Sequence, residues 1–137
     1  MRTIKFRGFT EDSDKNKWVY GYLTSENTIS YKTEDGFEMT RAVDKASVGQ
    51  FTGLYDVHNR KIYEGDTLRC WFVDENTGSS YNKKYDVEYF SGVGGYIICE
   101  PYDTDGNFIK LTSLEISKYN MEVFGNGFNL VNDFEDE

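Results

Sequence analysis

Short runs with the residue pattern of β-strands recur along this sequence, and turn residues separate them. No long stretch places apolar residues at the i, i+3, i+4 and i+7 positions of an amphipathic helix. The sequence therefore predicts an all-β fold of about nine short strands, in which one link, Ser113–Lys118, could form a single helical turn. The strand-like runs are Arg2–Arg7, Lys17–Leu23, Thr28–Lys32, Phe37–Arg41, Thr67–Val73, Tyr85–Phe90, Gly95–Glu100, Phe108–Thr112 and Asn120–Phe124.

Turn residues indicate where the predicted strands end and which of them pair. Asp35-Gly36 lies between two strand-like runs and predicts a hairpin, because both residue types tolerate positive φ. Glu64-Gly65-Asp66 predicts a tight turn into the next strand, in which Asp66 accepts a bond from a nearby amide. Within Tyr85–Phe90 the alternation predicts that Tyr85, Val87 and Tyr89 face inward, while Asp86 and Glu88 face outward.

Five short strands in the second half suggest a small antiparallel barrel or sandwich, barrel-like (SH3-like), preceded by an N-terminal β subdomain. No linker rich in Pro or Ser divides the chain, so we expect one domain over residues 1–137. Within it, residues 1–60 would form the N-terminal β part, 61–126 the barrel part and 127–137 an acidic tail.

Charge is distributed unevenly along the chain. Residues 1–72 carry eleven acidic and eleven basic side chains, so the whole net charge of −9 lies in residues 73–137. An acidic tail of this kind usually aids solubility and is less often an interaction peptide. Its carboxylates are Asp133, Glu135, Asp136 and Glu137.

This imbalance bears on the expected partners. Binding to a phosphate backbone needs lysines and arginines on one face, and the second half has only four basic residues. The basic residues near the start are interspersed with acids and predict a solvated mixed surface. Direct nucleic-acid binding is therefore not expected. Those basic residues are Arg2, Lys5, Arg7, Lys15 and Lys17.

The two cysteines, Cys70 and Cys99, are too few for a disulfide framework and lie in apolar strand-like runs. They are expected to be small buried hydrophobes, with a bridge between them conceivable only if their strands are neighbours. No stretch has the length of a signal peptide's apolar region or of a bilayer span. A cytoplasmic protein with no membrane partner is expected.

Motifs that resemble catalytic or metal sites have simpler structural explanations. His58 is the only histidine and lies in an apparent turn, which excludes multi-histidine metal sites. Asp103 and Asp105 lack the remaining spacing of a calcium loop and indicate a hairpin turn. Gly92–Gly95 lacks the Lys-Ser or Lys-Thr of a phosphate loop. No catalytic, metal or cofactor-binding residue is predicted, and the binding residues are left open.

Three stretches resemble the YopX-like family of bacteriophage and prophage proteins. The opening strand Arg2–Phe9 is similar, as is the central signature formed by Val48–Leu54, Asp56 and Ile62–Asp66. The closing strand Glu122–Asn126 completes the match. Two departures are Asn59, where the family usually has Gly in a turn, and the pair Gly127-Phe128. The resemblance implies a phage or prophage product with a small all-β fold, and it implies no activity.

The leading hypothesis is a non-enzymatic accessory protein that binds a protein partner through an aromatic-rich β surface. Self-association belongs to this hypothesis, because 23 aromatic side chains are many for one core of this size. A second hypothesis is an acidic decoy of a host DNA-binding protein, with carboxylates clustered on one face. A third is a hydrolase or nuclease that uses carboxylates. The decoy would cluster Asp74, Glu88, Glu100, Asp103 and Glu122.

Overall fold

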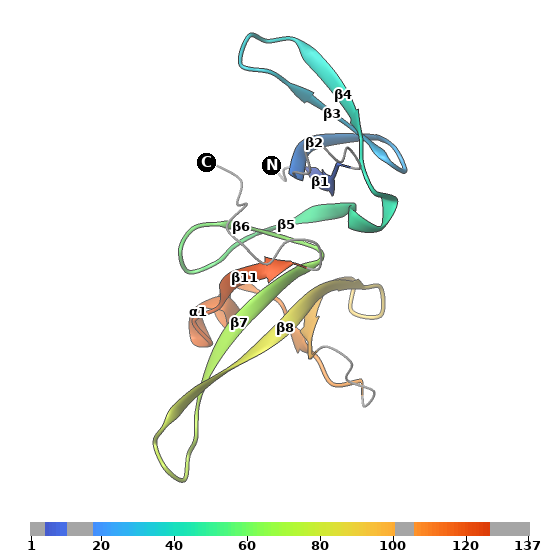
Figure 1. Cartoon of the computed structure of the whole chain (residues 1–137). Coiled ribbons are helices and arrows are strands. Elements are labelled where there is room, and N and C mark those ends of the chain that lie inside the picture. The colour runs from blue at the N-terminus through green and yellow to red at the C-terminus, as the bar shows by residue number, and fades with distance from the viewer. Residues whose placement is uncertain (1–4, 11–17, 101–105, 127–137) are drawn as a thin grey trace.

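The computed structural model describes residues 5–10, 18–100 and 106–126. These residues form eleven strands, one short 3-10 helix and one short α-helix, and the strands make two antiparallel sheets. Figure 1 shows that the hairpin β3–β4 and the hairpin β7–β8 extend from opposite ends of the molecule. The expected all-β class is confirmed.

The first sheet has six strands, in the order β4-β3-β2-β1-β5-β6. The register between β2 and β3 shifts between Leu23 and Ser25, close to the turn that joins these two strands. The β3–β4 turn contains Gly36 at a φ of 86°. The Asp-Gly hairpin predicted from the sequence is thus confirmed. The strands are β1 Phe6–Phe9, β2 Trp18–Ser25, β3 Thr28–Lys32, β4 Glu38–Ala42, β5 Gly49–Tyr55 and β6 Lys61–Tyr63.

The second sheet has five strands, in the order β10-β9-β8-β7-β11. Within the described residues β10 and β11 are its two edges, so the sheet does not close into the barrel that was expected. Its strands are β7 Asp66–Val73, β8 Ser80–Phe90, β9 Gly95–Cys99, β10 Ile109–Lys110 and β11 Glu122–Asn126.

Two short helices connect the strands. The 3-10 helix η1 (Lys45–Ser47) follows Asp44, whose carboxylate accepts a hydrogen bond from the Ala46 amide. The six-residue helix α1 (Ser113–Lys118) begins after Thr112, whose hydroxyl accepts from the Glu115 amide at 3.2 Å. Capping by Ser, Thr and Asp satisfies amides that have no partner within the helix. The single helical turn predicted at Ser113–Lys118 is confirmed.

Each sheet packs its own apolar cluster. The larger cluster covers the inner face of the second sheet, where Leu68, Ile98 and Met121 have no exposed surface. A smaller cluster of Val19, Ile29 and Val43 lies on one face of the first sheet. Burial of apolar side chains contributes about 25 cal/mol per Å², so the larger cluster makes the larger contribution to stability.

Asp56 joins the β5–β6 turn to the second sheet. One carboxylate oxygen accepts from the His58 and Arg60 amides, both at 2.9 Å, and the other accepts from the Val123 amide at 2.9 Å. In this turn Asn59 has a φ of 65°. Asparagine tolerates the left-handed region better than most residues, so the turn forms with asparagine at this position, as expected.

Several sequence predictions need correction. The segment 48–63 contains two strands, β5 and β6, that the sequence pattern did not reveal. Tyr89 was expected to face inward, but it is 53% exposed, and its ring makes a T-shaped contact with that of Tyr96. Arg7 was assigned to a solvated surface, but it is 4% exposed.

Neither cysteine is in a disulfide, and β8 lies between their strands β7 and β9, so they do not meet the condition for a bridge. Cys70 is fully buried, as expected, while Cys99 is only half-buried. In the part of the chain that the structure describes, no helix is long and apolar enough to cross a bilayer.

Candidate binding face on the six-stranded sheet

A row of aromatic rings lies along one face of the first sheet, from its interior to its exposed end. Trp18, Tyr20 and Tyr22 alternate along β2, so their side chains point to the same face. The Tyr20 and Tyr63 ring centroids are 5.5 Å apart, and the Tyr63 and Phe51 centroids are 5.6 Å apart. Such tilted contacts stabilise aromatic pairs beyond simple burial. We call this the aromatic face.

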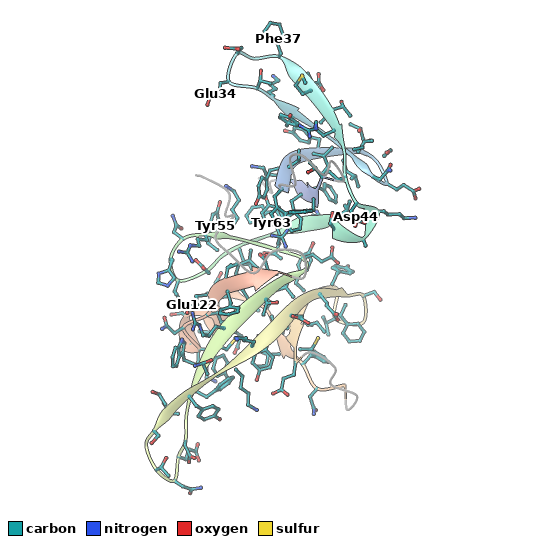
Figure 2. The ribbon with its side chains drawn as sticks, in the orientation of Figure 1. Glu34, Phe37, Asp44, Tyr55, Tyr63 and Glu122 are labelled. Atoms are coloured by element: carbon teal, nitrogen blue, oxygen red, sulfur yellow. The ribbon has the colours of Figure 1, made fainter. Side chains whose placement is uncertain are left out.

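Arg7 is the centre of the buried end of this face. Its guanidinium carbon lies 4.3 Å from the centroid of the Trp18 ring and 5.0 Å from that of the Tyr63 ring. Figure 2 labels Tyr63, which lies where the two sheets approach each other. Cation–π contacts hold the planar guanidinium against both rings, which fixes the ring positions.

Asp66 neutralises Arg7 within the fold. Arg7 Nη1 lies 2.7 Å from Asp66 Oδ1, and the other Asp66 oxygen accepts from the Tyr63 amide at 2.8 Å. Burial raises the pKa of the Asp66 carboxyl, while Arg7 and the Tyr63 amide oppose that shift. The Glu64-Gly65-Asp66 turn predicted from the sequence is confirmed, with Gly65 at a φ of 93°.

The exposed end of the aromatic face is a groove of about 520 Å³. Tyr22 is 70% exposed there, and the strand register places Ser30 directly opposite it. The Ser30 hydroxyl donates a hydrogen bond to Glu38 Oε1 at 2.8 Å. Glu38 is the only acidic residue among those that line the groove, and this bond fixes the position of its carboxylate. The groove is lined by Lys5, Tyr20, Gly21, Tyr22, Ser30, Tyr31, Lys32 and Glu38.

The lining of the groove holds more basic than acidic side chains. It includes two lysines, Lys5 and Lys32, and one carboxylate, Glu38, in the half of the chain (residues 1–72) whose charges balance. Phenol rings with their hydroxyls, beside ammonium groups, can stack on apolar groups and attract carboxylates. This combination suits a ligand that has both an aromatic or apolar side chain and negative charge.

A second cavity of about 400 Å³ lies at the junction of the two sheets. Arg7 and Trp18 line it from the first sheet, and Thr67, Asp86 and Glu88 line it from the second. The Thr67 hydroxyl donates to Asp86 at 3.1 Å. Among the described residues, no three His, Cys, Asp or Glu side chains could hold a metal ion together.

His58, Glu122 and Arg69 form a row of contacting side chains. His58 Nε2 is 2.9 Å from one Glu122 carboxylate oxygen, and Arg69 Nε is 2.7 Å from the other. The hydrogen bond with His58 and, after it, the charge of Arg69 lower the pKa of Glu122. Figure 2 shows Glu122 on the second sheet. The row joins the β5–β6 turn to β11 and β7, which is a structural role.

The remaining candidates are placed as follows. The glycine-rich run Gly92–Gly95 lies at the turn between β8 and β9, as expected, and its last residue, Gly95, begins β9. Asp103 and Asp105 lie outside the described residues. Of the acids named for a decoy, Asp74 accepts from the Asn76 amide in the β7–β8 turn, and Glu100 pairs with Lys83 at 3.1 Å. These local partners give no support to a shared phosphate-like surface.

Sequence reasoning missed the aromatic face because its residues come from four separate segments. The signal was present in part: the run Lys17–Leu23 is aromatic or apolar on both faces, which predicts that both faces are covered or used. Only the register reveals Arg7 opposite Tyr20. No alternation within one strand can show that pairing.

Comparison with known proteins agrees with the sequence resemblance. No curated protein matches the chain. The model of one family, described as YopX protein, matches residues 5–129, which include the aromatic face and both sheets. The chain therefore belongs to the YopX protein family.

Proposed function

We propose that this chain is a non-enzymatic accessory protein of a bacteriophage or prophage, and that it binds a partner protein through the groove of the aromatic face. The bound element is an extended peptide segment with carboxylates and an aromatic or large apolar side chain. The observation that carries the proposal is Tyr22, which is 70% exposed in a groove of about 520 Å³ that Lys5 and Lys32 also line.

An exposed tyrosine in a groove is a suitable anchor for a peptide. Tyrosine and tryptophan are enriched among the residues that dominate binding energy. Beneath Tyr22, the ring stack of Tyr20, Tyr63 and Phe51 is fixed by the buried Arg7–Asp66 pair. A preorganised surface loses little conformational entropy when a ligand binds, which favours affinity.

Charge selects the class of partner. Lysines at the rim attract an acidic segment and repel a basic one, so they contribute mainly to specificity and association rate. A nucleic acid is a poorer candidate, because each phosphate contact needs a cation and the groove has two. The net charge of −9 adds long-range repulsion against a polyanion.

The test is an NMR titration of the isotope-labelled full chain with three probes. These are a synthetic peptide that alternates glutamate and phenylalanine, the same peptide with lysine in place of glutamate, and an oligothymidylate. The acidic peptide should cause saturable shifts at the amides of Tyr20–Tyr22 and Ser30–Lys32. Binding of the oligothymidylate alone, or shifts confined to the second sheet, would overturn the proposal.

Two variants locate the binding energy. Tyr22→Ala should weaken binding of the acidic peptide about tenfold, the equivalent of ~1.4 kcal/mol. Tyr89→Ala is the matched control, because Tyr89 is an exposed tyrosine (53%) on the other sheet. Equal loss in both variants would show that the groove is not the site.

A further inference from the structure

We propose that two copies of this chain associate through the outer edge of β4, so that the two β4 strands pair antiparallel and join the six-stranded sheets into one. This pairing uses a different surface from the groove, and it stands even where the groove binds no peptide. Three features of β4 support it: an edge without protection, backbone groups that point outward and a self-complementary arrangement of side chains.

The edge of β4 lacks the features by which proteins usually keep edge strands from pairing with another chain. Such strands are short, bulged or covered, or they carry Pro or Lys. β4 contains neither Pro nor Lys, and its register with β3 continues over five residue pairs without a shift. The β3–β4 hairpin extends from one end of the molecule, with Phe37 at its tip (Figures 1 and 2). A second chain can therefore approach this edge.

The other edge strands of the two sheets are protected. β6 has three residues and β10 has two. The register of β11 is irregular between Val123 and Gly125. The β5–β6 turn also covers β11, because the Asp56 carboxylate accepts from the Val123 amide and the Val57 amide donates to the Met121 carbonyl. Among the edges that the structure describes, β4 is thus the one suited to pairing with another strand.

The backbone groups at the centre of β4 point outward. The Thr33 amide donates to the Phe37 carbonyl, which makes these two a hydrogen-bonded pair of the hairpin. Hydrogen-bonded and non-hydrogen-bonded pairs alternate along an antiparallel ladder, so Met39 also bonds to β3. The N–H and C=O groups of Glu38 and Thr40 therefore point away from β3, to the side where β4 has no neighbouring strand in the described sheet.

One register suits the pairing of two identical strands. A two-fold axis at Met39 places this residue opposite Met39 of the second copy, and Glu38 then exchanges backbone hydrogen bonds with Thr40 of the second copy. A shift in one direction would put Glu38 opposite Glu38, and like charges directly opposite each other destabilise a sheet. A shift in the other direction would extend the pairing to the end of β4, where Val43 already bridges to Thr10.

The side chains of this register are complementary. Phe37 and Met39 are 69% and 44% exposed, and they alternate with Arg41 onto one face of the strand. Arg41 comes to lie opposite Phe37 of the second copy, where a cation–π contact can form, and beside the acidic turn Glu34-Asp35 of that copy. A parallel pairing would instead place Arg41 beside Arg41, so charge selects the antiparallel arrangement.

The resulting dimer should be weak and should bring two grooves together. An interface of one strand pair is smaller than the area typical of stable complexes, so association requires a high protein concentration. The two-fold axis is perpendicular to the joined sheet, so both grooves open on the same face. Five strand spacings separate the two copies of Tyr22, which is about 24 Å. A partner with two acidic segments would then bind with avidity, and this consequence alone rests on the proposed function.

Sedimentation equilibrium of the full chain over a series of concentrations tests the pairing. The unaltered chain should shift from monomer towards dimer as its concentration rises. Met39→Lys should raise the dissociation constant about tenfold or more, because the two-fold axis brings two like charges together. Met39→Glu should have the same effect, but an equimolar mixture of the two variants should associate again, since lysine then faces glutamate.

Leu114→Lys is the matched control, because Leu114 is an apolar residue of α1 that is 74% exposed and lies far from β4 along the chain. It makes the same change in net charge and should leave the dissociation constant unchanged. Amide NMR spectra check that each variant keeps the signal dispersion of the folded chain, and recovery of association in the mixture requires that both variants are folded.

Each contrary result has a distinct meaning. A chain that stays monomeric at the highest concentration reached would overturn the pairing, as would a dimer that Met39→Lys leaves unchanged. Equal weakening by Leu114→Lys would show a general charge effect and would overturn it too. A mixture of folded variants that associates no better than either variant alone would refute the register centred on Met39, and with it the proposed dimer. Peptide binding in the groove is tested separately by the NMR titration.

Discussion

Arg7 and Asp66 form an ion pair 2.7 Å long, with side chains that are only 5% and 2% exposed. The pair connects β1 of the first sheet with the start of β7 in the second. Removing one partner of a buried pair leaves an uncompensated charge, which typically costs about 3–5 kcal/mol. Arg7→Met and Asp66→Asn should each lower the free energy of unfolding by about that amount in urea titrations.

The double variant distinguishes a pair from two independent residues. Arg7→Met combined with Asp66→Asn removes both charges, so it should be less destabilised than the sum of the two single variants. A strictly additive loss would contradict the direct coupling of these residues.

Gly49 is required by a close approach between strands. A Cβ atom at this position would collide with the backbone carbonyl oxygen of Glu64. Gly49→Ala should therefore destabilise the fold by about 1–3 kcal/mol, because the backbone must shift. Gly95→Ala is the control: its Cβ would meet open space, and the change should stay within about 0.5 kcal/mol. Thermal unfolding of both variants measures the difference.

Stability should depend on pH through Glu122. Its pKa is lowered in the folded state, first by the His58 hydrogen bond. A carboxyl group whose pKa is lower in the folded than in the unfolded state stabilises the fold. This stabilisation is complete above the pKa of the unfolded state, here 4.5, and it is lost as the pH falls through the pKa of the folded state. Because His58 is half-exposed, the contribution stays below about 1 kcal/mol. Urea midpoints should show that Glu122→Gln is destabilising near neutral pH and that this difference disappears in acid.

The two thiols should differ in reactivity. Burial raises the pKa of Cys70 to about 12, whereas Cys99 is half-buried on β9. The thiolate is the reactive form, so Cys70 should react with a thiol reagent only when the fold opens. Mass spectrometry should find one rapid modification at Cys99 and a second that appears in denaturant. Rapid double modification of the native protein would contradict the burial of Cys70.

Local patterns were sufficient to predict the strands whose residues alternate and whose turns contain glycine. Thr28–Lys32 matches β3 in full, and the Glu64-Gly65-Asp66 turn is where it was expected. Strands β5 and β6 were missed because Gly49, Gly53 and Asn59 resemble loop residues in sequence. Here Gly49 serves a close contact, and Gly53, at a φ of 85°, lies at an irregular point in the β5–β6 register.

The aromatic face could not be predicted for a different reason. Arg7 was expected to face solvent because it alternates with Phe6 along the strand. That expectation is correct for a strand that has one face exposed to solvent. Its burial depends on Trp18, Tyr63 and Asp66, which come from three other strands. Long-range pairing of this kind is set by the tertiary register, which no single segment encodes.

The central claim is that the Tyr22 groove selects an acidic peptide by charge, and a charge exchange at Lys32 tests it most directly. Isothermal titration of the unaltered full chain and of Lys32→Glu should be done with the glutamate–phenylalanine peptide and with its lysine counterpart. The account predicts that the unaltered chain prefers the acidic peptide and that Lys32→Glu loses or inverts this preference. The same preference in both chains, or equal binding of both peptides to the unaltered chain, would contradict the account.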